Sequence, residues 1–307
     1  MQLMTTRSTT LTHRRPLSER AIERLLFAAA ALGVLTTIGI VAVLAFETLG
    51  FFLRVSPVDF FTGTHWSALI KPQAWGVLAL MSGTLLVSGI ATILAVPLGL
   101  LAAVFLSEYA SPRVRTIVKP ILETIAGVPT IVLGFFGLNF IAPHILRPLL
   151  GSDNIGTFSA LSGGIVVGLL ITPLIASISE DAIRAVPRGL REAAFAMGAT
   201  RFEVVRKVVF PAAISGIMAA IILALSRAVG ETMAVALAVG TKPQLSFDPT
   251  ESVQTMTAFI AQISIGETAQ GSIEFQSLFA VGATLFVMTF ALNILSARIV
   301  GRYRTAY

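Results

Sequence analysis

Long uncharged runs divide the chain into six apolar segments. One of the six, residues 208–240, is interrupted only by Arg227 and Glu231. Each run reaches the roughly 20 residues that a helix needs to cross a bilayer. The pattern therefore predicts six membrane-spanning helices. The five runs that contain no Asp, Glu, Lys or Arg are residues 25–46, 72–107, 124–146, 154–179 and 275–297.

The composition indicates an all-α integral membrane protein. Of the 307 residues, 55% are hydrophobic and only 12% are charged, which is far more apolar than an ordinary soluble domain. Apolar runs of this length favour helices, because lipid offers the backbone no hydrogen-bond partner and a helix satisfies its own polar groups. We expect a tail at 1–24, a single transmembrane domain at 25–300 and a second tail at 301–307.

Basic residues predict the orientation of the chain. Most of the 22 lysines and arginines lie in the two tails and in the 107–119 and 187–207 loops. By the positive-inside rule these segments are cytoplasmic, so both termini are expected inside. The charges are divided between the spans and form no aromatic-interleaved patch, so no nucleic-acid partner is predicted. The segments expected to face outward are residues 50–71, 147–153 and 241–274.

The loop between the fourth and fifth spans has the pattern of two helices joined by a stop. Pro187 suits a first helical turn, and Gly198 is a C-terminal stop signal. The spacing of Thr200 and Glu203 predicts a capping box at the start of the next helix. One interpretation is an amphipathic connector that rests on lipid headgroups.

The same loop resembles the EAA loop of ABC importer permeases, which is the second interpretation. The resemblance implies that 187–211 is a coupling loop whose short helix inserts into a groove of a cytoplasmic ATPase. None of the four lysines completes a phosphate-binding P-loop sequence, so we expect ATP and Mg to be used by a partner and not by this chain. The residues that match the family pattern are Glu192, Ala193, Ala194, Gly198 and Pro211, with Val208 and Phe210 where the pattern has Ile and Leu.

Further stretches narrow the resemblance. Residues 172–213, with "SEDAIRAVP", and 226–240, "SRAVGETMAVALAVG", are similar to the PstC-type permease of the bacterial phosphate-specific ABC importer. The resemblance implies a six-helix type I importer permease in the inner membrane. It also implies a PstA-type permease as the other half of the pore, a PstB-type ATPase dimer and a PstS-type phosphate-binding protein.

Two alternatives stay open at this point. One is a permease for another oxyanion, such as sulfate, molybdate or phosphonate. The other is a secondary carrier that works without ATP, although the inverted repeats typical of such carriers are not evident in the sequence.

Arg227 and Glu231 are the candidate substrate-pathway residues. An ionised Arg in mid-membrane costs roughly 2.5 to 3.5 kcal/mol on insertion scales, so such a residue normally faces the interior of the bundle. In a continuous helix the two residues lie on one face. One hypothesis is a structural ion pair. The other is that Arg227 attracts an oxyanion while Glu231 accepts a hydrogen bond from a protonated phosphate oxygen.

Several other residues predict local features of the structure. Lys119 and Glu123 are four residues apart and predict an ion pair at the cytoplasmic end of the third span. Residues 127–129, Gly-Val-Pro, predict a helix break that follows this pair. The outer segment 241–276 contains an apolar piece that fits a surface helix, a re-entrant helix or a packed cap.

No residue set predicts a metal or cofactor site within this chain. Cysteine is absent, so thiolate metal sites are excluded. The three histidines, His13, His65 and His144, are assigned to tails or loops, away from any carboxylate cluster.

Overall fold

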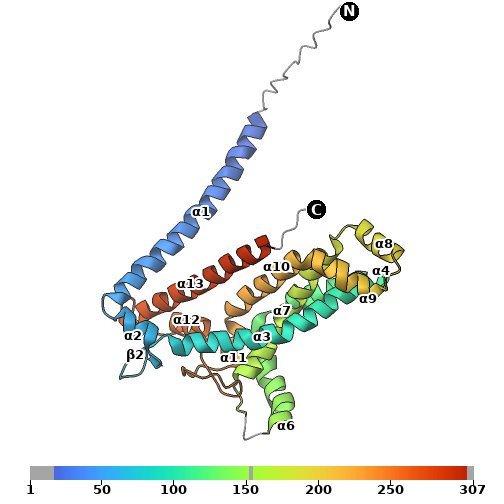
Figure 1. Cartoon of the computed structure of the whole chain (residues 1–307). Coiled ribbons are helices and arrows are strands. Elements are labelled where there is room, and N and C mark those ends of the chain that lie inside the picture. The colour runs from blue at the N-terminus through green and yellow to red at the C-terminus, as the bar shows by residue number, and fades with distance from the viewer. Residues whose placement is uncertain (1–16, 152–154, 303–307) are drawn as a thin grey trace, which may run out of the picture. The chain divides into compact units, whose positions relative to one another are not determined.

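The structure is a computed structural model that describes residues 17–151 and 155–302 (Figure 1). In this part the regular elements are helices, apart from the two strands of one short hairpin. The elements, in chain order, are α1 (Leu17–Phe52), α2 (Pro57–Thr62), β1 (Trp66–Ser67), β2 (Ala74–Trp75), α3 (Leu78–Val104), η1 (Phe105–Tyr109), α4 (Pro112–Ala126), α5 (Thr130–Phe136), η2 (Gly137–Leu146), α6 (Arg147–Leu150), α7 (Ala160–Arg184), α8 (Arg188–Ala196), α9 (Arg201–Val204), η3 (Val205–Val209), α10 (Phe210–Val229), α11 (Met233–Ala238), α12 (Met256–Ile265) and α13 (Ile273–Arg302), where η denotes a π-helical segment.

Six helices are long and apolar enough to cross a membrane, which confirms the predicted number of spans in the part of the chain that is described. The predicted tails fall largely outside the described residues, although α1 begins at Leu17 and α13 reaches Arg302. The spans are Ala21–Phe52, Leu78–Tyr109, Thr130–Leu150, Ala160–Arg184, Arg201–Val229 and Ile273–Arg298.

The chain forms two compact units, residues 1–46 and 47–307. In the first unit the described part is the N-terminal portion of α1, and its large apolar side chains, such as Phe27 and Leu32, are exposed. Exposed apolar side chains on a helix of this length are what a lipid environment requires. The second unit contains all the other elements.

Helix α7 is the centre of the second unit and packs along α3. Gly164 allows the two helices to approach closely, because a Cβ atom at this position would lie 2.5 Å from the Ile90 side chain. Close packing through small residues is typical of membrane helices, where apolar burial does not itself distinguish protein from lipid. Val167 and Ile171 of α7 are fully buried in the resulting core.

An aromatic cluster closes one end of the second unit. Strands β1 and β2 pair antiparallel with Trp66 opposite Trp75. Trp66 packs edge-on against Phe259 of α12 with ring centroids 4.9 Å apart, and Phe60 of α2 joins the same cluster. The apolar piece of the outer segment is therefore α12, a helix packed into this cap. The exposed α8 and the start of α4 lie at the opposite end (Figure 1).

The third span begins directly after the helix break that the sequence predicts at residues 127–129. Helix α4 ends at Ala126 and α5 begins at Thr130. Residues 127–129 form the break between the two helices. Proline disfavours a helical conformation in the residue before it, which explains the stop. Helix α4 is consequently a separate amphipathic helix, and it buries none of its residues within this chain.

Candidate functional site

The predicted coupling loop folds as a helix, a glycine turn and a second helix. Helix α8 ends at Ala196, and Gly198 follows with φ +81°, a conformation that favours glycine. Both hydrogen bonds of the predicted capping box are present: Glu203 N donates to Thr200 Oγ1 at 3.3 Å, and Thr200 N donates to Glu203 Oε2 at 3.0 Å. The local sequence signals of this turn are confirmed.

The two faces of α8 have different surroundings. Leu190 and Ala194 pack against a buried cluster formed by the ends of α3, α7 and α10. Glu192 and Ala193 are exposed, and so is Phe195. Met197, which follows the last residue of the helix, is 88% exposed. The exposed edge of the loop is thus partly apolar.

A π-helical segment leads from the loop into the fifth span. Pro211 lacks a backbone N–H and is the second residue of α10, directly after η3. A proline at this place removes one i→i−4 hydrogen bond, and the wider π turn accommodates the loss. Pro211 therefore marks the point where the coupling loop enters the transmembrane helix.

Arg191, which precedes the matched Glu192, ties α8 to two other elements. Its Nη2 atom donates to Glu108 Oε1 of η1 at 2.9 Å and to the carbonyl of Ile183 at 2.7 Å, and its Nη1 atom donates to the carbonyl of Val186. Ile183 lies in the last turn of α7 and Val186 lies just beyond its end, so Arg191 also caps that helix. Arg191 was not predicted from the sequence, because its partner Glu108 lies 83 positions away.

A second set of charges joins α4 to α7. Glu180 is fully buried, and its carboxylate lies 2.8 Å from Arg115 Nη2 and 2.9 Å from Lys119 Nζ. Arg184 Nη1 is 3.9 Å away on the next turn of α7. The predicted pair between Lys119 and Glu123 is wrong: Lys119 turns to α7, where it contacts Glu180 and Asp181. We call Arg115, Lys119, Glu180 and Arg184 the ion cluster.

The ion cluster shifts the pKa of Lys119. Partial burial opposes the charged ammonium, but hydrogen bonds and charge attraction from Asp181 and Glu180 outweigh it and raise the pKa of Lys119 above its ordinary value of 10.5. The amine is therefore charged throughout the physiological range. Attraction within the cluster is strong because the carboxylate of Glu180 is removed from water.

Arg227 and Glu231 do not lie on one continuous helix, so the predicted geometry is wrong. Helix α10 ends at Val229, and the chain passes through Gly230 before α11 begins at Met233. The structure contains no ion pair between the two side chains. Glu231 Oε1 instead accepts a hydrogen bond from Ala234 N at 3.2 Å and thereby caps α11.

The helix break is held by a long-range contact. Thr257 of α12 donates its hydroxyl to the Glu231 carbonyl at 2.7 Å. Glu231 is 9% exposed, whereas Arg227 is exposed and makes no ion pair within the described part of the chain. Next to it, Ser226 Oγ donates to Asn293 Oδ1 of α13 at 3.1 Å. Arg227 is thus a free cation on an apolar span, beside a polar contact.

The described residues contain no group of three or more His, Asp or Glu side chains placed to hold a metal ion. His13 lies outside the described part. His65 precedes the hairpin, as expected for a loop residue. His144 is not in a loop, because it belongs to η2, where its ring stacks on Phe140 with centroids 5.5 Å apart.

Comparison with known proteins finds a family match over most of the chain. Residues 95–305 match the family described as "Binding-protein-dependent transport system inner membrane component". A probable ABC transporter permease protein, YqgH of Bacillus subtilis (strain 168), is 34% identical over 283 residues, which cover 92% of this chain and 90% of that protein. The phosphate transport system permease protein PstC of Mesorhizobium japonicum is 35% identical over 278 residues, covering 85% of this chain and 84% of that protein.

Solved structures share the fold. A chain of a bacterial alginate ABC transporter, in complex with an alginate pentasaccharide-bound periplasmic protein, aligns with a TM-score of 0.62 and 16% identity, over 95% of this chain and 99% of that chain. A chain of the MetNI methionine ABC transporter aligns with a TM-score of 0.56 and 22% identity, over 77% of this chain and 100% of that chain.

Proposed function

Because this chain belongs to the family of binding-protein-dependent transport system inner membrane components, we propose that it forms half of the pore of an ATP-driven importer of inorganic phosphate. It is a multi-pass inner membrane protein of the type I importer permease fold. The main support for the transport mechanism is the segment α8–Gly198–α9, in which two exposed helices joined by a turn lie at one end of the bundle. The phosphate assignment is supported by PstC relatives such as that of Mesorhizobium japonicum.

The partners follow from the same proposal. Phe195 and Met197 present apolar surface on the exposed coupling loop, which suits insertion into the groove of a PstB-type ATPase dimer that uses ATP and Mg. A PstA-type permease supplies the other half of the pore, and a PstS-type protein delivers phosphate from outside. In this arrangement both termini and the 187–211 loop are cytoplasmic.

Arg227 is the proposed attractant for the substrate. Arg227 lies on an apolar span and has no ion-pair partner among the described residues. Because such a cation is costly in lipid, we place it in a water-filled pathway at the junction with the other permease. A guanidinium binds the oxygen atoms of an oxyanion through its planar fork of donors. The proposed role of Glu231 is to accept a hydrogen bond from a protonated phosphate oxygen, with the carboxylate oxygen that does not cap α11.

Transport needs ATP because phosphate moves against the membrane potential. Each negative charge brought inward costs roughly 2.3 kcal/mol per 100 mV. The hydrolysis of ATP by the partner supplies this work, and α8 transmits the movement to the bundle. A passive pore with the same anion selectivity would release phosphate outward.

Uptake by the reconstituted complex tests the proposed function. Proteoliposomes with this chain, its partner permease and ATPase, and the loaded binding protein are expected to accumulate labelled phosphate only with ATP. Excess sulfate, molybdate or phosphonate is expected to compete weakly. Stronger transport of one of these oxyanions would reassign the substrate, and uptake without ATP would refute the importer mechanism.

A further inference from the structure

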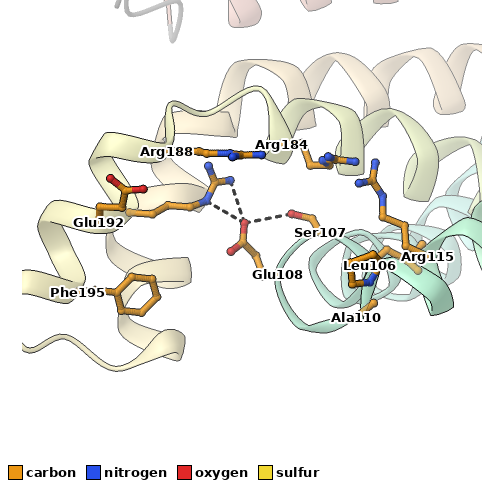
Figure 2. Close-up of a pocket in the computed structure, with 11 residues that line it drawn as sticks. Leu106, Ser107, Glu108, Ala110, Arg115, Arg184, Arg188, Glu192 and Phe195 are labelled. Atoms are coloured by element: carbon orange, nitrogen blue, oxygen red, sulfur yellow. Dashed lines mark hydrogen bonds and ion pairs between the residues drawn. The ribbon is translucent and has the colours of Figure 1, made fainter.

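A cavity of about 510 Å³ lies beside the coupling helix, and the charged residues in its lining are mostly arginines (Figure 2). It is formed by η1, the start of α4, the end of α7 and the first turns of α8. Four arginines but only two carboxylates line it. These charged residues are Arg115, Arg184, Arg188, Arg191, Glu108 and Glu192.

The carboxylates do not neutralise all of these arginines. Glu108 is occupied by Arg191 at 2.9 Å. Arg115 is paired with the buried Glu180 behind the cavity, but Arg184 reaches the same carboxylate only at 3.9 Å and is 45% exposed. Arg188 has no ion pair or hydrogen bond within the described part of the chain. Two guanidinium groups therefore retain free donors at the cavity.

The arrangement of these groups suits an oxyanion. Figure 2 shows the guanidinium groups of Arg115, Arg184 and Arg188 along one side of the cavity. Arg188 is also the first residue of α8, and Pro187 before it offers no side-chain cap. The positive end of the helix dipole adds to the potential of the arginines. Guanidinium groups bind phosphate oxygen atoms in bidentate fashion.

We propose that this cavity binds a phosphate group through Arg184 and Arg188. The phosphate group is supplied either by free inorganic phosphate or by the headgroup of an anionic phospholipid, since α8 and the start of α4 lie at the end of the spans that is predicted to meet the cytoplasm. Occupation of the site would tie the end of α7 to the coupling helix. The proposal does not depend on which substrate the pore carries.

The test measures the reactivity of each arginine in the assembled transporter. The complex is placed in nanodiscs of phosphatidylcholine and treated with phenylglyoxal, and modified residues are identified by mass spectrometry. One arm adds inorganic phosphate at constant ionic strength, and the other replaces part of the lipid with phosphatidylglycerol. Arg206, an exposed arginine of the same loop that does not line the cavity, is the internal control.

With the phosphate ligand at about ten times its dissociation constant, we expect modification of Arg184 and Arg188 to slow by about tenfold, because protection follows occupancy of the site, while Arg206 is unchanged. Protection by inorganic phosphate identifies the free anion, and protection only by phosphatidylglycerol identifies the headgroup. No protection in either arm overturns the proposal, as does equal protection of Arg206. Slow modification of Arg184 and Arg188 in the complex before either source of phosphate is added also overturns it, because a partner side chain would then fill the cavity.

A variant supplies a second measurement. Arg188→Gln removes one guanidinium that has no ion pair in the described structure, so the fold is expected to persist. The ligand concentration that protects Arg184 should rise about tenfold. Arg206→Gln should leave this concentration unchanged. An unchanged concentration in Arg188→Gln would show that Arg188 is not part of the site. Phosphate bound in the pore does not alter this measurement, because modification of Arg227 and of Arg184 is detected on different peptides.

Discussion

The carboxylate of Glu180 on α7 lies 2.8 Å from the guanidinium of Arg115 on α4, and Glu180 is fully buried. Helix α4 buries no residue of its own in this chain, so charge attraction within the ion cluster is a main tie between α4 and α7. Helix α4 leads to the break before α5, and α7 leads to the coupling helix. The contact therefore joins the coupling end of the bundle to the third span.

Replacing Glu180 by Gln should destabilise the protein strongly. Removing one member of a buried ion pair costs about 3–5 kcal/mol, because the remaining charges lose their partner. Arg115 and Lys119 are 24% and 23% exposed and can reach water, so we expect the lower end of this range. The measurement is the thermal unfolding of the assembled complex.

Asp181→Asn is the matched control: Asp181 also pairs with Lys119 but is 63% exposed, so its loss should cost less than about 1 kcal/mol. Equal destabilisation by both changes would contradict a special role for burial.

Lys119 predicts a pH dependence at the alkaline end. Its pKa is raised in the folded protein, so its contribution to stability is complete below the unfolded value of 10.5 and is lost as pH rises through the folded pKa. The difference in unfolding temperature between the wild-type protein and Lys119→Met should be constant near neutral pH and shrink only above about pH 10.5. A difference that shrinks close to neutral pH would refute this assignment.

Glu108→Gln should weaken coupling between the ATPase and the pore. The change removes the negative charge that Arg191 contacts at 2.9 Å, and a hydrogen bond to a charged group contributes about 1.5–3 kcal/mol. We expect several-fold less phosphate transported per ATP hydrolysed. The control is Lys207→Gln, which removes an exposed ion pair to Glu203 in the same loop and should have little effect. An unchanged transport ratio in Glu108→Gln would exclude the contact from coupling.

The turn at Gly198 should tolerate few side chains. No atom lies within 4 Å of a Cβ built there, but its φ of +81° is unfavourable for other residues by roughly 1–2 kcal/mol. Gly198→Val should therefore abolish the stimulation of ATPase activity by loaded binding protein, and Gly198→Asn should retain part of it. Gly189→Ala is the control, because Gly189 also has open space but lies in α8 without a positive φ. Full stimulation in Gly198→Val would show that the turn is not required.

Arg227→Gln should stop phosphate uptake without preventing assembly. The side chain is exposed and has no ion pair within the described residues, so its loss leaves no buried charge behind. Glu231→Gln should also assemble, since an amide oxygen can still accept the hydrogen bond from Ala234 N. If the Glu231 carboxylate selects protonated phosphate, this second variant should admit sulfate more readily.

The measurement for both variants is uptake of labelled phosphate, with and without excess sulfate, at equal amounts of assembled complex. Arg206→Gln, which removes an exposed loop cation, is the control for a general change in charge. Wild-type uptake by Arg227→Gln would defeat its substrate role. Unchanged discrimination against sulfate in Glu231→Gln would leave Glu231 as a helix cap alone.

Features set by neighbouring residues were predictable from the sequence. Six spans follow from the length of the uncharged runs, because lipid accepts only long apolar helices. The turn at Gly198 and the capping box of Thr200 and Glu203 were also predictable, since their hydrogen bonds join residues close in the chain. The break before α5 depends on Pro129, whose ring restricts the residue beside it.

The tertiary structure alone decided which charges meet. Spacing suggested pairs between Lys119 and Glu123 and between Arg227 and Glu231, because residues four apart face each other in an unbroken helix. Instead Lys119 turns to Glu180, 61 positions away, and Thr257 helps to hold the break that separates Arg227 from Glu231. Such contacts depend on how helices pack against one another. The periodicity of a single helix contains no information about a charge or a hydroxyl that a distant segment brings to its side.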